Sequence, residues 1–277
     1  MIFSQPDFSV QPVQAPVRNE SLFACFNKGK ILMHDENGRL TLPTMAQLSS
    51  VLPASFSPFE LAHTDSVSIF CPHPFENFDL PETEKLRYKE VGVFRALPYD
   101  TAALITTSWH LWSWYQNNRF CGRCGCENQP DEKERALRCC ACGKLLFPII
   151  CPAIIVAITC GDRILLVRNA RSTFTHYALV AGYVEVGETL EHAVHREVLE
   201  EVGIKLSSLR YIGNQPWGVS GSHMFAFHAT ADDDQPIHLQ ESELTEARWF
   251  RKDELKPREH MVSIAAELIE RFRLGTL

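Results

Sequence analysis

The sequence lacks an apolar run long enough to cross a bilayer as a helix. The longest, Leu145 to Ile158, is interrupted by Pro148 and Pro152, whereas a spanning helix needs about 20 consecutive apolar residues. The first ten residues also lack any basic side chain and any long apolar stretch, and a secretory signal requires both. We therefore expect a cytoplasmic protein with no membrane segment.

The sequence also lacks an excess of positive charge. Its 277 residues include 34 Asp and Glu against 27 Lys and Arg, a net charge of −7. This balance excludes a general electrostatic attraction to nucleic acid or anionic lipid, although it leaves room for a small local patch. Apolar residues make up 45% of the chain, enough for folded cores, and the length suggests about two domains.

The first 118 residues carry no recognisable chemical motif. Pro- and Ser-rich breaks separate short apolar-aromatic runs at Ser21–Phe26, Gly29–Met33 and Val67–Cys71, which predict several short strands. Apolar residues in helical register predict a helix over Thr101–Tyr115. We interpret residues 1–118 as a mixed α+β domain that serves as a scaffold or for dimerisation.

Six of the ten cysteines fall within 22 residues, from Cys121 to Cys142. In a chain without an export signal, such a cluster favours metal binding over disulfides. Two Cys-x-x-Cys pairs separated by 14 residues supply four thiolates for a tetrahedral Zn²⁺ site: Cys121, Cys124, Cys139 and Cys142. Four protein ligands leave no open position, so one structural zinc is predicted in a ribbon over residues 119–146. Cys126 and Cys140 are spare.

A zinc ribbon can also contact nucleic acid, and this alternative stays open. Between Arg119 and Lys144 there are six basic and four acidic residues, a net charge of only +2. That is a weak patch.

Residues 147–277 alternate between strand and helix patterns. Predicted strands at Ala153–Cys160 and Arg163–Val167 flank the turn residues Gly161-Asp162. The other expected elements are strands at Tyr177–Ala181, Leu209–Gly213, Met224–Thr230 and Ala247–Phe250, and helices at Glu188–Val202 and Met261–Arg273. Strands interleaved with helices predict an α/β/α sandwich, so the fold class of the whole chain is α+β.

One predicted helix gathers three carboxylates on a narrow face. Glu197, Glu200 and Glu201 stand at i, i+3 and i+4 and span about 100° of the helix. Like charges this close repel unless a cation lies between them, which suits a hard divalent ion with oxygen ligands. A solvated acidic face is the alternative. The opposite face would pack into the core, and Leu199 and Val202 are also expected to meet apolar neighbours.

The same segment, GYVEVGETLEHAVHREVLEEVGI, follows the Nudix box, a motif of Gly, Glu, Arg-Glu and Glu-Glu at fixed spacing with a final Gly. The matching positions are Gly182, Glu188, Arg196, Glu197, Val198, Glu200, Glu201, Gly203 and Ile204. The chain thus resembles the Nudix hydrolases, which cleave nucleoside diphosphates linked to another group. The resemblance implies two or three catalytic Mg²⁺ or Mn²⁺ ions held by the Ala181 carbonyl, Glu197, Glu200, Glu201 and Glu243, with Glu200 as a further ligand or as a base.

A zinc ribbon before a Nudix domain resembles the NADH pyrophosphatase family, as does the Gln215-Pro216-Trp217 stretch downstream. Members continue with Pro-Phe-Pro, where this chain has Gly218-Val219-Ser220, so we expect a smaller and more flexible loop and an altered substrate preference. The family pattern implies substrate contacts at Glu134, Phe147, Tyr183, Gln215, Pro216, Trp217, Ser222 and Ala265.

The resemblance therefore implies a homodimeric enzyme that hydrolyses NAD(H) to NMN(H) and AMP, and that also removes NAD caps from RNA. Two alternatives stay open. One is a Nudix hydrolase of another dinucleotide such as ADP-ribose, and the other is a non-catalytic nucleotide-sensing regulator.

Overall fold

The computed structural model describes residues 16–63, 68–76, 79–170, 177–232, 235–258 and 261–277. Internal contacts divide the chain into two compact units. The C-terminal unit comprises Ile150–Trp217 and Gly221–Leu277, and the N-terminal unit runs to Ile149 and includes Gly218–Ser220. Each unit is described by itself.

The N-terminal unit contains two small sheets. One has the strand order β1-β6-β5, and the other has the order β2-β3-β4 with β7 also paired to β3. The strands are β1 (Leu22–Phe23), β2 (Phe26–Asn27), β3 (Lys30–Glu36), β4 (Arg39–Thr41), β5 (Pro58–His63), β6 (Ser68–Pro72) and β7 (Leu86–Glu90). The short helices are α1 (Met45–Leu48) and the 3₁₀ turn η1 (Val91–Ala96). A mixed α+β arrangement was predicted here, although β4, β5 and β7 were not.

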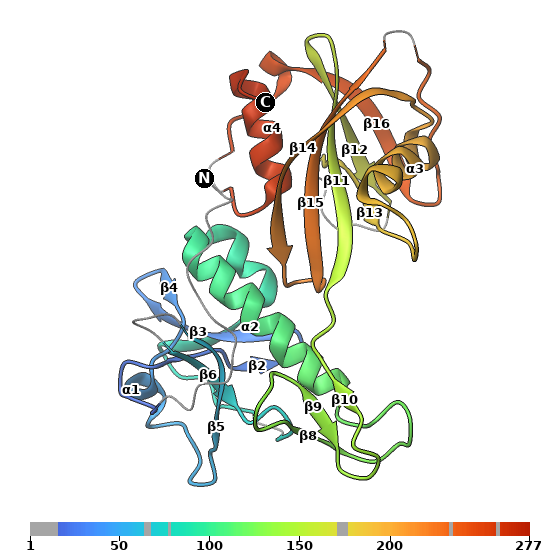
Figure 1. The fold of residues 1–277 in the computed structure, drawn as a ribbon. Coiled ribbons are helices and arrows are strands. Elements are labelled where there is room, and N and C mark those ends of the chain that lie inside the picture. Colours follow the sequence, from blue (N-terminus) through green and yellow to red (C-terminus); the bar gives the residue numbers. More distant parts are fainter. Residues whose placement is uncertain (1–15, 64–67, 77–78, 171–176, 233–234, 259–260) are drawn as a thin grey trace. The chain divides into compact units, whose positions relative to one another are not determined.

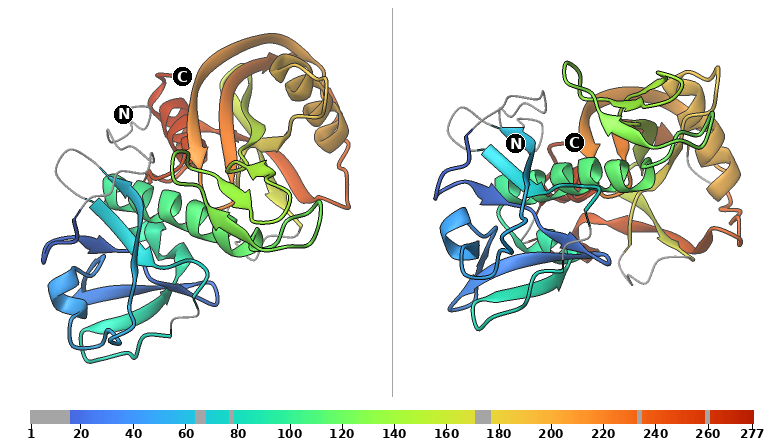
Figure 2. Two further views of the ribbon diagram at one scale, coloured as in Figure 1. Left: turned by 60° about the horizontal axis from the view of Figure 1, so that its bottom comes forward. Right: turned by 90° about the horizontal axis from the view of Figure 1, so that it is seen from below.

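A long helix, α2 (Tyr99–Asn117), confirms the helix predicted at Thr101–Tyr115. Figures 1 and 2 show it beside the strands of this unit. Side-chain contacts agree, because the Phe26 ring of β2 lies 5.3 Å from both the Trp109 and the Trp112 ring of α2, centroid to centroid. Aromatic packing therefore fixes α2 to the strands.

The cysteine-rich segment after α2 forms a small antiparallel sheet of three strands. They are β8 (Asn128–Pro130), β9 (Leu137–Cys139) and β10 (Leu145–Leu146). Arg135 joins this segment to the rest of the unit, because its Nη1 donates a 3.0 Å hydrogen bond to the Glu60 carbonyl of β5. This bond across 75 positions is one reason why the segment belongs to the N-terminal unit.

The C-terminal unit is a six-stranded mixed sheet with a helix on each face (Figure 1). The strand order is β14-β15-β11-β12-β16, and β13 pairs with β11. The strands are β11 (Cys151–Cys160), β12 (Arg163–Asn169), β13 (Val180–Tyr183), β14 (Leu206–Trp217), β15 (Ser222–Ala231) and β16 (Leu244–Arg251). The helices are α3 (Leu190–Val202) and α4 (Ile264–Leu274), with the 3₁₀ turn η2 (Lys252–Glu254) between β16 and α4.

Two hydrophobic cores separate the layers of this unit. Val194, Val198 and Val202 of α3 pack on one face of the sheet, and Leu268 and Phe272 of α4 pack on the other. This is the α/β/α sandwich that the sequence predicts. Within the described ranges, no helix is long and apolar enough to cross a membrane.

Capping residues set the observed helix starts. The predicted helices at Glu188 and Met261 begin later, at Leu190 and Ile264. Thr189 and Ser263 explain the difference, because each side chain accepts a hydrogen bond from a backbone N–H of the first turn. The strand predicted at Tyr177–Ala181 is observed as β13, three residues further on.

Gly203 ends α3 in the left-handed region, with φ of +71°, and a Cβ there would lie 2.8 Å from Cβ of His238. We expect Gly203→Ala to lower the free energy of unfolding by about 2 kcal/mol, because backbone strain adds to a steric clash. Gly161→Ala is the matched control, since Gly161 also has positive φ but no atom near its Cβ position. Urea unfolding measures both variants, and equal losses would contradict the clash.

Candidate functional site

The carboxylates of α3 divide into buried and exposed members. Glu201 is 5% exposed and Glu197 is half-buried, whereas Glu200 faces solvent. Burial, together with three neighbouring carboxylates, raises the pKa of Glu201 to about 8. Burial also raises the pKa of Glu197, against the opposing effect of Arg196. A solvated acidic face would bury none of these groups, so that alternative is not supported.

The Glu197 carboxylate packs closely against the backbone of β13. A Cβ at Gly182 would lie 2.0 Å from the carboxyl carbon of Glu197, so any side chain at this position would displace the Glu197 carboxylate. The preceding residue, Ala181, pairs with Ile155 of β11. The loop from β13 to α3 therefore brings backbone and carboxylate together at one point of the sheet.

Arg196 is the hub of the site. Its Nε and Nη2 form a bidentate ion pair with Glu188, at 2.9 Å each. Nη1 donates to Glu197 at 2.8 Å and to Glu200 at 3.1 Å, and Nη2 also donates to the Tyr183 carbonyl. The sequence analysis did not predict the bridge to Glu197 and Glu200, although the i, i+4 spacing of Arg196 and Glu200 could have indicated it.

Glu188 fixes the loop that precedes α3. Hydrogen bonds from Arg196, from the Glu185 N–H at 3.0 Å and from His192 hold its carboxylate and lower its pKa to about 2. The group therefore stays ionised at neutral pH. A fixed anion here positions Arg196 for the other carboxylates.

Glu243 adds a fourth carboxylate from the segment before β16. Its charge raises the pKa of both Glu197 and Glu201, which places it near both. Its backbone is tied down, because its carbonyl accepts a 2.7 Å hydrogen bond from the Ala170 N–H. Buried anions that face one another are stabilised by a proton or by a cation. The donor set, all oxygen, fits a hard divalent ion.

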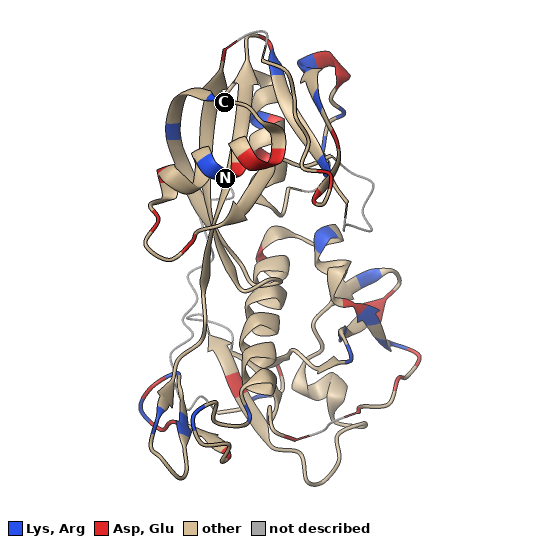
Figure 3. Ribbon diagram, turned by 90° about the vertical axis from the view of Figure 1, so that its right-hand side faces the viewer, with Lys and Arg blue, Asp and Glu red and all other residues tan. Residues whose placement is uncertain are grey.

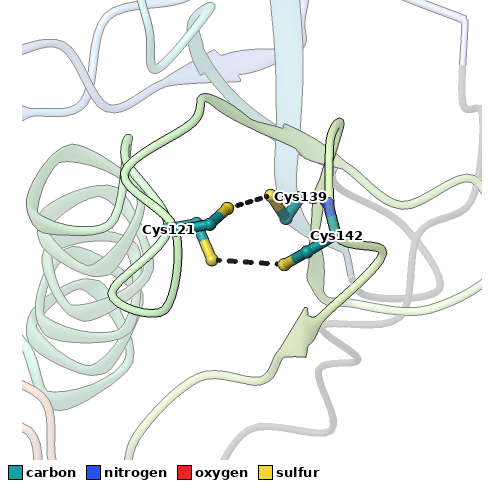
Figure 4. Close-up of side chains that lie close together, drawn as sticks. Cys121, Cys139 and Cys142 are labelled. Carbon is teal, nitrogen blue, oxygen red and sulfur yellow. Dashed lines mark hydrogen bonds between the residues drawn. The ribbon is translucent and has the colours of Figure 1, made fainter.

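The four predicted zinc ligands meet in the small sheet after α2. The Sγ atoms of Cys121, Cys124, Cys139 and Cys142 all lie within 4.8 Å of one another, and no other such group of three or more was found in the described ranges. The Sγ atoms of Cys121 and Cys142 are 3.8 Å apart, and Figure 4 shows the labelled sulfurs facing one another. A Zn–S length of about 2.3 Å gives a tetrahedral edge of about 3.8 Å, so the cluster fits zinc.

Backbone N–H groups of the two Cys-x-x-Cys turns stabilise the thiolate form of two cysteines. The N–H of Arg123 donates to Sγ of Cys121, and the N–H of Cys142 donates to Sγ of Cys139. These bonds lower the pKa of Cys121, and they lower that of Cys139 to about 6. Cys126 and Cys140 lie outside the four-sulfur group, as predicted.

The predicted substrate residues of the C-terminal unit lie on or beside the sheet, and hydrogen bonds fix Tyr183, Ser222 and Gln215. The Tyr183 hydroxyl lies 3.2 Å from the hydroxyl of buried Ser222. The Gln215 amide donates to the Val262 carbonyl, and its oxygen accepts from the Ile264 N–H. Gln215 therefore holds the start of α4, and its contact with substrate stays a prediction. The predicted substrate contacts of Pro216, Trp217 and Ala265 also stay predictions.

The segment Gly218-Val219-Ser220 belongs to the N-terminal unit and packs against its long helix. A Cβ at Gly218 would lie 2.1 Å from the Thr106 carbonyl oxygen of α2. Glycine is required there by close backbone packing, which the expectation of a merely flexible loop did not include. Glu134 and the exposed Phe147 also belong to the N-terminal unit, and their predicted substrate contacts remain untested.

The raised pKa of Glu201 predicts a pH-dependent stability. Between its ordinary value of 4.5 and about 8, the folded protein holds a proton that the unfolded chain releases, so stability falls as pH rises through this window. We expect the Tm without added divalent ions to fall from pH 5 to pH 8, and Mg²⁺ to restore more of it at pH 8. Glu188, whose pKa is lowered, contributes to the pH dependence of stability only below pH 4.5.

Calorimetry of Glu201→Gln checks this assignment, because the amide cannot titrate and the slope should flatten. Glu191→Gln is the control, since Glu191 is exposed in the first turn of the same helix. An unchanged slope in Glu201→Gln would contradict the assignment.

The zinc site predicts that Cys139→Ser reduces the zinc content from one ion per chain to near zero and destabilises the N-terminal unit. Structural zinc contributes directly to folding. Cys140→Ser is the control, because Cys140 lies next to Cys139 in the sequence but outside the four-sulfur group. Elemental analysis and thermal unfolding give the result, and equal zinc in both variants would refute the site.

Comparisons with known proteins agree with this geometry. Residues 150–272 match the NUDIX domain family, and residues 116–147 match the NADH pyrophosphatase zinc ribbon domain. A protein of Haemophilus influenzae (strain PittGG) named NAD-capped RNA hydrolase NudC is 38% identical over 188 residues, which cover 67% of this chain and 71% of that protein. The protein of the same name from Mannheimia succiniciproducens is 41% identical, over 63% of this chain and 68% of its own length.

Among solved structures, a NUDIX hydrolase from Nitrosomonas europaea has 20% identity and a TM-score of 0.46, covering 57% of this chain and 91% of that one. The family follows from the sequence relatives and from the matched domains. The chain belongs to the Nudix hydrolases, in the group that carries an NADH pyrophosphatase zinc ribbon.

Proposed function

We propose that this protein is a divalent-metal-dependent pyrophosphatase that hydrolyses NAD(H) to NMN(H) and AMP and removes NAD caps from RNA. The observation that carries the proposal is the burial of Glu197 and Glu201 beside Glu243, next to an arginine that bridges two carboxylates. The names of the similar curated proteins, NAD-capped RNA hydrolase, support the substrate.

The reaction adds water across the pyrophosphate. The oxygen of water bonds to one phosphorus, the bridging oxygen leaves with the other phosphate, and two monophosphates form. When bound, divalent ions neutralise the phosphate oxygens and lower the pKa of water. We propose that two or three Mg²⁺ or Mn²⁺ ions serve this purpose, held by Glu197, Glu201, Glu243 and the Ala181 carbonyl.

The residues of the chain hold the charges and move the proton. Glu200 is exposed at the end of the Arg196 bridge, so its free oxygen can hold a further ion or accept the proton of the attacking water. Arg196 and Glu188 keep the carboxylates in place while substrate enters. Gly182 keeps the space for the Glu197 carboxylate.

The substrate rings would contact aromatic side chains. Tyr183 is 51% exposed although its hydroxyl is held near Ser222, so its ring is available at a fixed position for stacking. We propose the same for the exposed ring of Phe147. Glu134, Gln215, Pro216, Trp217 and Ala265 complete the proposed substrate contacts.

Further parts of the proposal concern organisation. We propose a cytoplasmic homodimer with domains at 1–118, 119–146 and 147–277. Basic and acidic residues are interspersed along the chain (Figure 3), and the net charge is −7. Recognition of capped RNA would then depend on the cap more than on general attraction to the phosphate backbone.

The proposal predicts that the protein with Mg²⁺ or Mn²⁺ converts NADH and NAD⁺ to NMN(H) and AMP, and releases NMN from NAD-capped RNA. Glu201→Gln should lower kcat roughly 100-fold or more, because it removes a charged ligand from the transition state. Glu191→Gln should keep activity. Chromatography of the products measures both reactions.

The same assay separates the alternatives. Faster turnover of ADP-ribose than of NAD(H) would favour a different dinucleotide. Binding without turnover of any substrate, in folded and zinc-loaded protein, would indicate a nucleotide sensor and would refute the proposal.

A further inference from the structure

The N-terminal unit contains a cavity of about 430 Å³ that the proposed reaction does not use. Its walls come from the turn after β2, from the end of β6 and the segment that follows it, and from α2. The volume lies within the usual range for small-molecule sites, about 300–1,000 Å³. All of its lining residues belong to this unit.

Aromatic rings form one side of the cavity. Phe26 and Trp112 line it, and their ring centroids are 5.3 Å apart. The Trp109 ring packs against the Trp112 ring, at a centroid distance of 5.5 Å and an interplanar angle of 31°. Trp112 is only half-buried, so the cavity offers the aromatic type that attracts cations most strongly.

Acidic and amide groups form another side. Asp79 and Glu76 line the cavity and are both exposed. One oxygen of Asp79 accepts a 2.7 Å hydrogen bond from the Asn27 amide, which orients the carboxylate. Among the described residues, Glu76 has no salt-bridge partner. With Lys28 as the one cation of the lining, the charge of the cavity is −1.

Lys28 stands at a strained position of the wall. It has φ of +46°, and Gly29 follows with φ of +80°, in the two-residue turn that joins β2 to β3. Asn or Gly at Lys28 would adopt this conformation at lower cost. Such strain often persists at ligand sites, and the exposed Lys28 side chain can turn outward from the cavity.

We propose that this cavity binds a flat organic cation, such as an N-alkylated pyridinium ring, against Trp112 and Phe26 with Glu76 and Asp79 as counter-charges. A phosphate group inside the cavity would meet two carboxylates and only one ammonium, and a neutral ring would gain nothing from the acidic side. The cation can be a free small molecule or the oxidised nicotinamide end of a dinucleotide. The proposal rests on the cavity alone and does not depend on the proposed hydrolysis.

The test uses two probes that differ in ring charge, 1-methylnicotinamide and neutral nicotinamide, titrated calorimetrically into the full-length protein. We expect the cation to bind and the neutral ring to bind about three- to thirtyfold more weakly, the range of a cation–π contact. Trp112→Leu and Glu76→Gln should each weaken the binding of the cation. Glu76 is exposed, so the second variant keeps the test valid if the first does not fold.

A further titration of NAD⁺ and NADH separates the two sources of the cation. It is made in the Glu201→Gln background, where hydrolysis is suppressed. A preference for NAD⁺ that Glu76→Gln removes would identify the dinucleotide, and binding of 1-methylnicotinamide alone would identify a free small molecule.

Two results would overturn the proposal: equal binding of both nicotinamides, or cation binding that neither cavity variant changes. The last would locate the cation elsewhere, for example at the carboxylates of α3. NADH hydrolysis is measured on the same variants. Hydrolysis that persists while cation binding is lost would show that the two sites are separate, and absent hydrolysis with intact cation binding would refute only the proposed function.

Discussion

Repulsion among the carboxylates of α3 is the constraint around which the C-terminal unit is organised. Glu197 and Glu201 are partly or fully buried, and Glu243, in the segment before β16, lies near both. Placing anions together in a low-dielectric environment is unfavourable. The fold tolerates it because Val194, Val198 and Val202 pack the same helix into a core, while Arg196 and Glu188 fix the exposed side. A cation placed among these carboxylates would relieve their repulsion.

The helix and the cysteine knuckles could be predicted from sequence because the interactions that define them are local. Glu197, Glu200 and Glu201 share a face by helical geometry alone, and the cysteine spacings alone select four of the six clustered thiols. Leu199 shows the limit of this reasoning. It was expected to pack, but it is 52% exposed, because periodicity gives the direction of a side chain and not the width of the packed face.

Contacts between distant residues could not be predicted. Gln215 bonds to Val262 and Ile264, 47 and 49 positions away, and this changes its interpretation from a substrate contact alone to a residue that anchors α4. Arg135 likewise reaches the carbonyl of Glu60 and, at 3.4 Å, the hydroxyl of Tyr115. These bonds explain why the ribbon is grouped with the N-terminal unit, although its composition marks it as a separate segment.

The segment after Trp217 shows how an altered motif can have a structural cause. Proline and phenylalanine in the family pattern would bring side chains to positions where this chain has Gly218 and Val219. At Gly218 the backbone lies so close to the Thr106 carbonyl that even a methyl group would overlap it. The Thr106 side chain adds to the rigidity of that surface, because its hydroxyl donates to the carbonyls of Ala102 and Ala103 within α2. The segment is thus held by close backbone packing at Gly218, so the small residues do not make it a freely flexible loop.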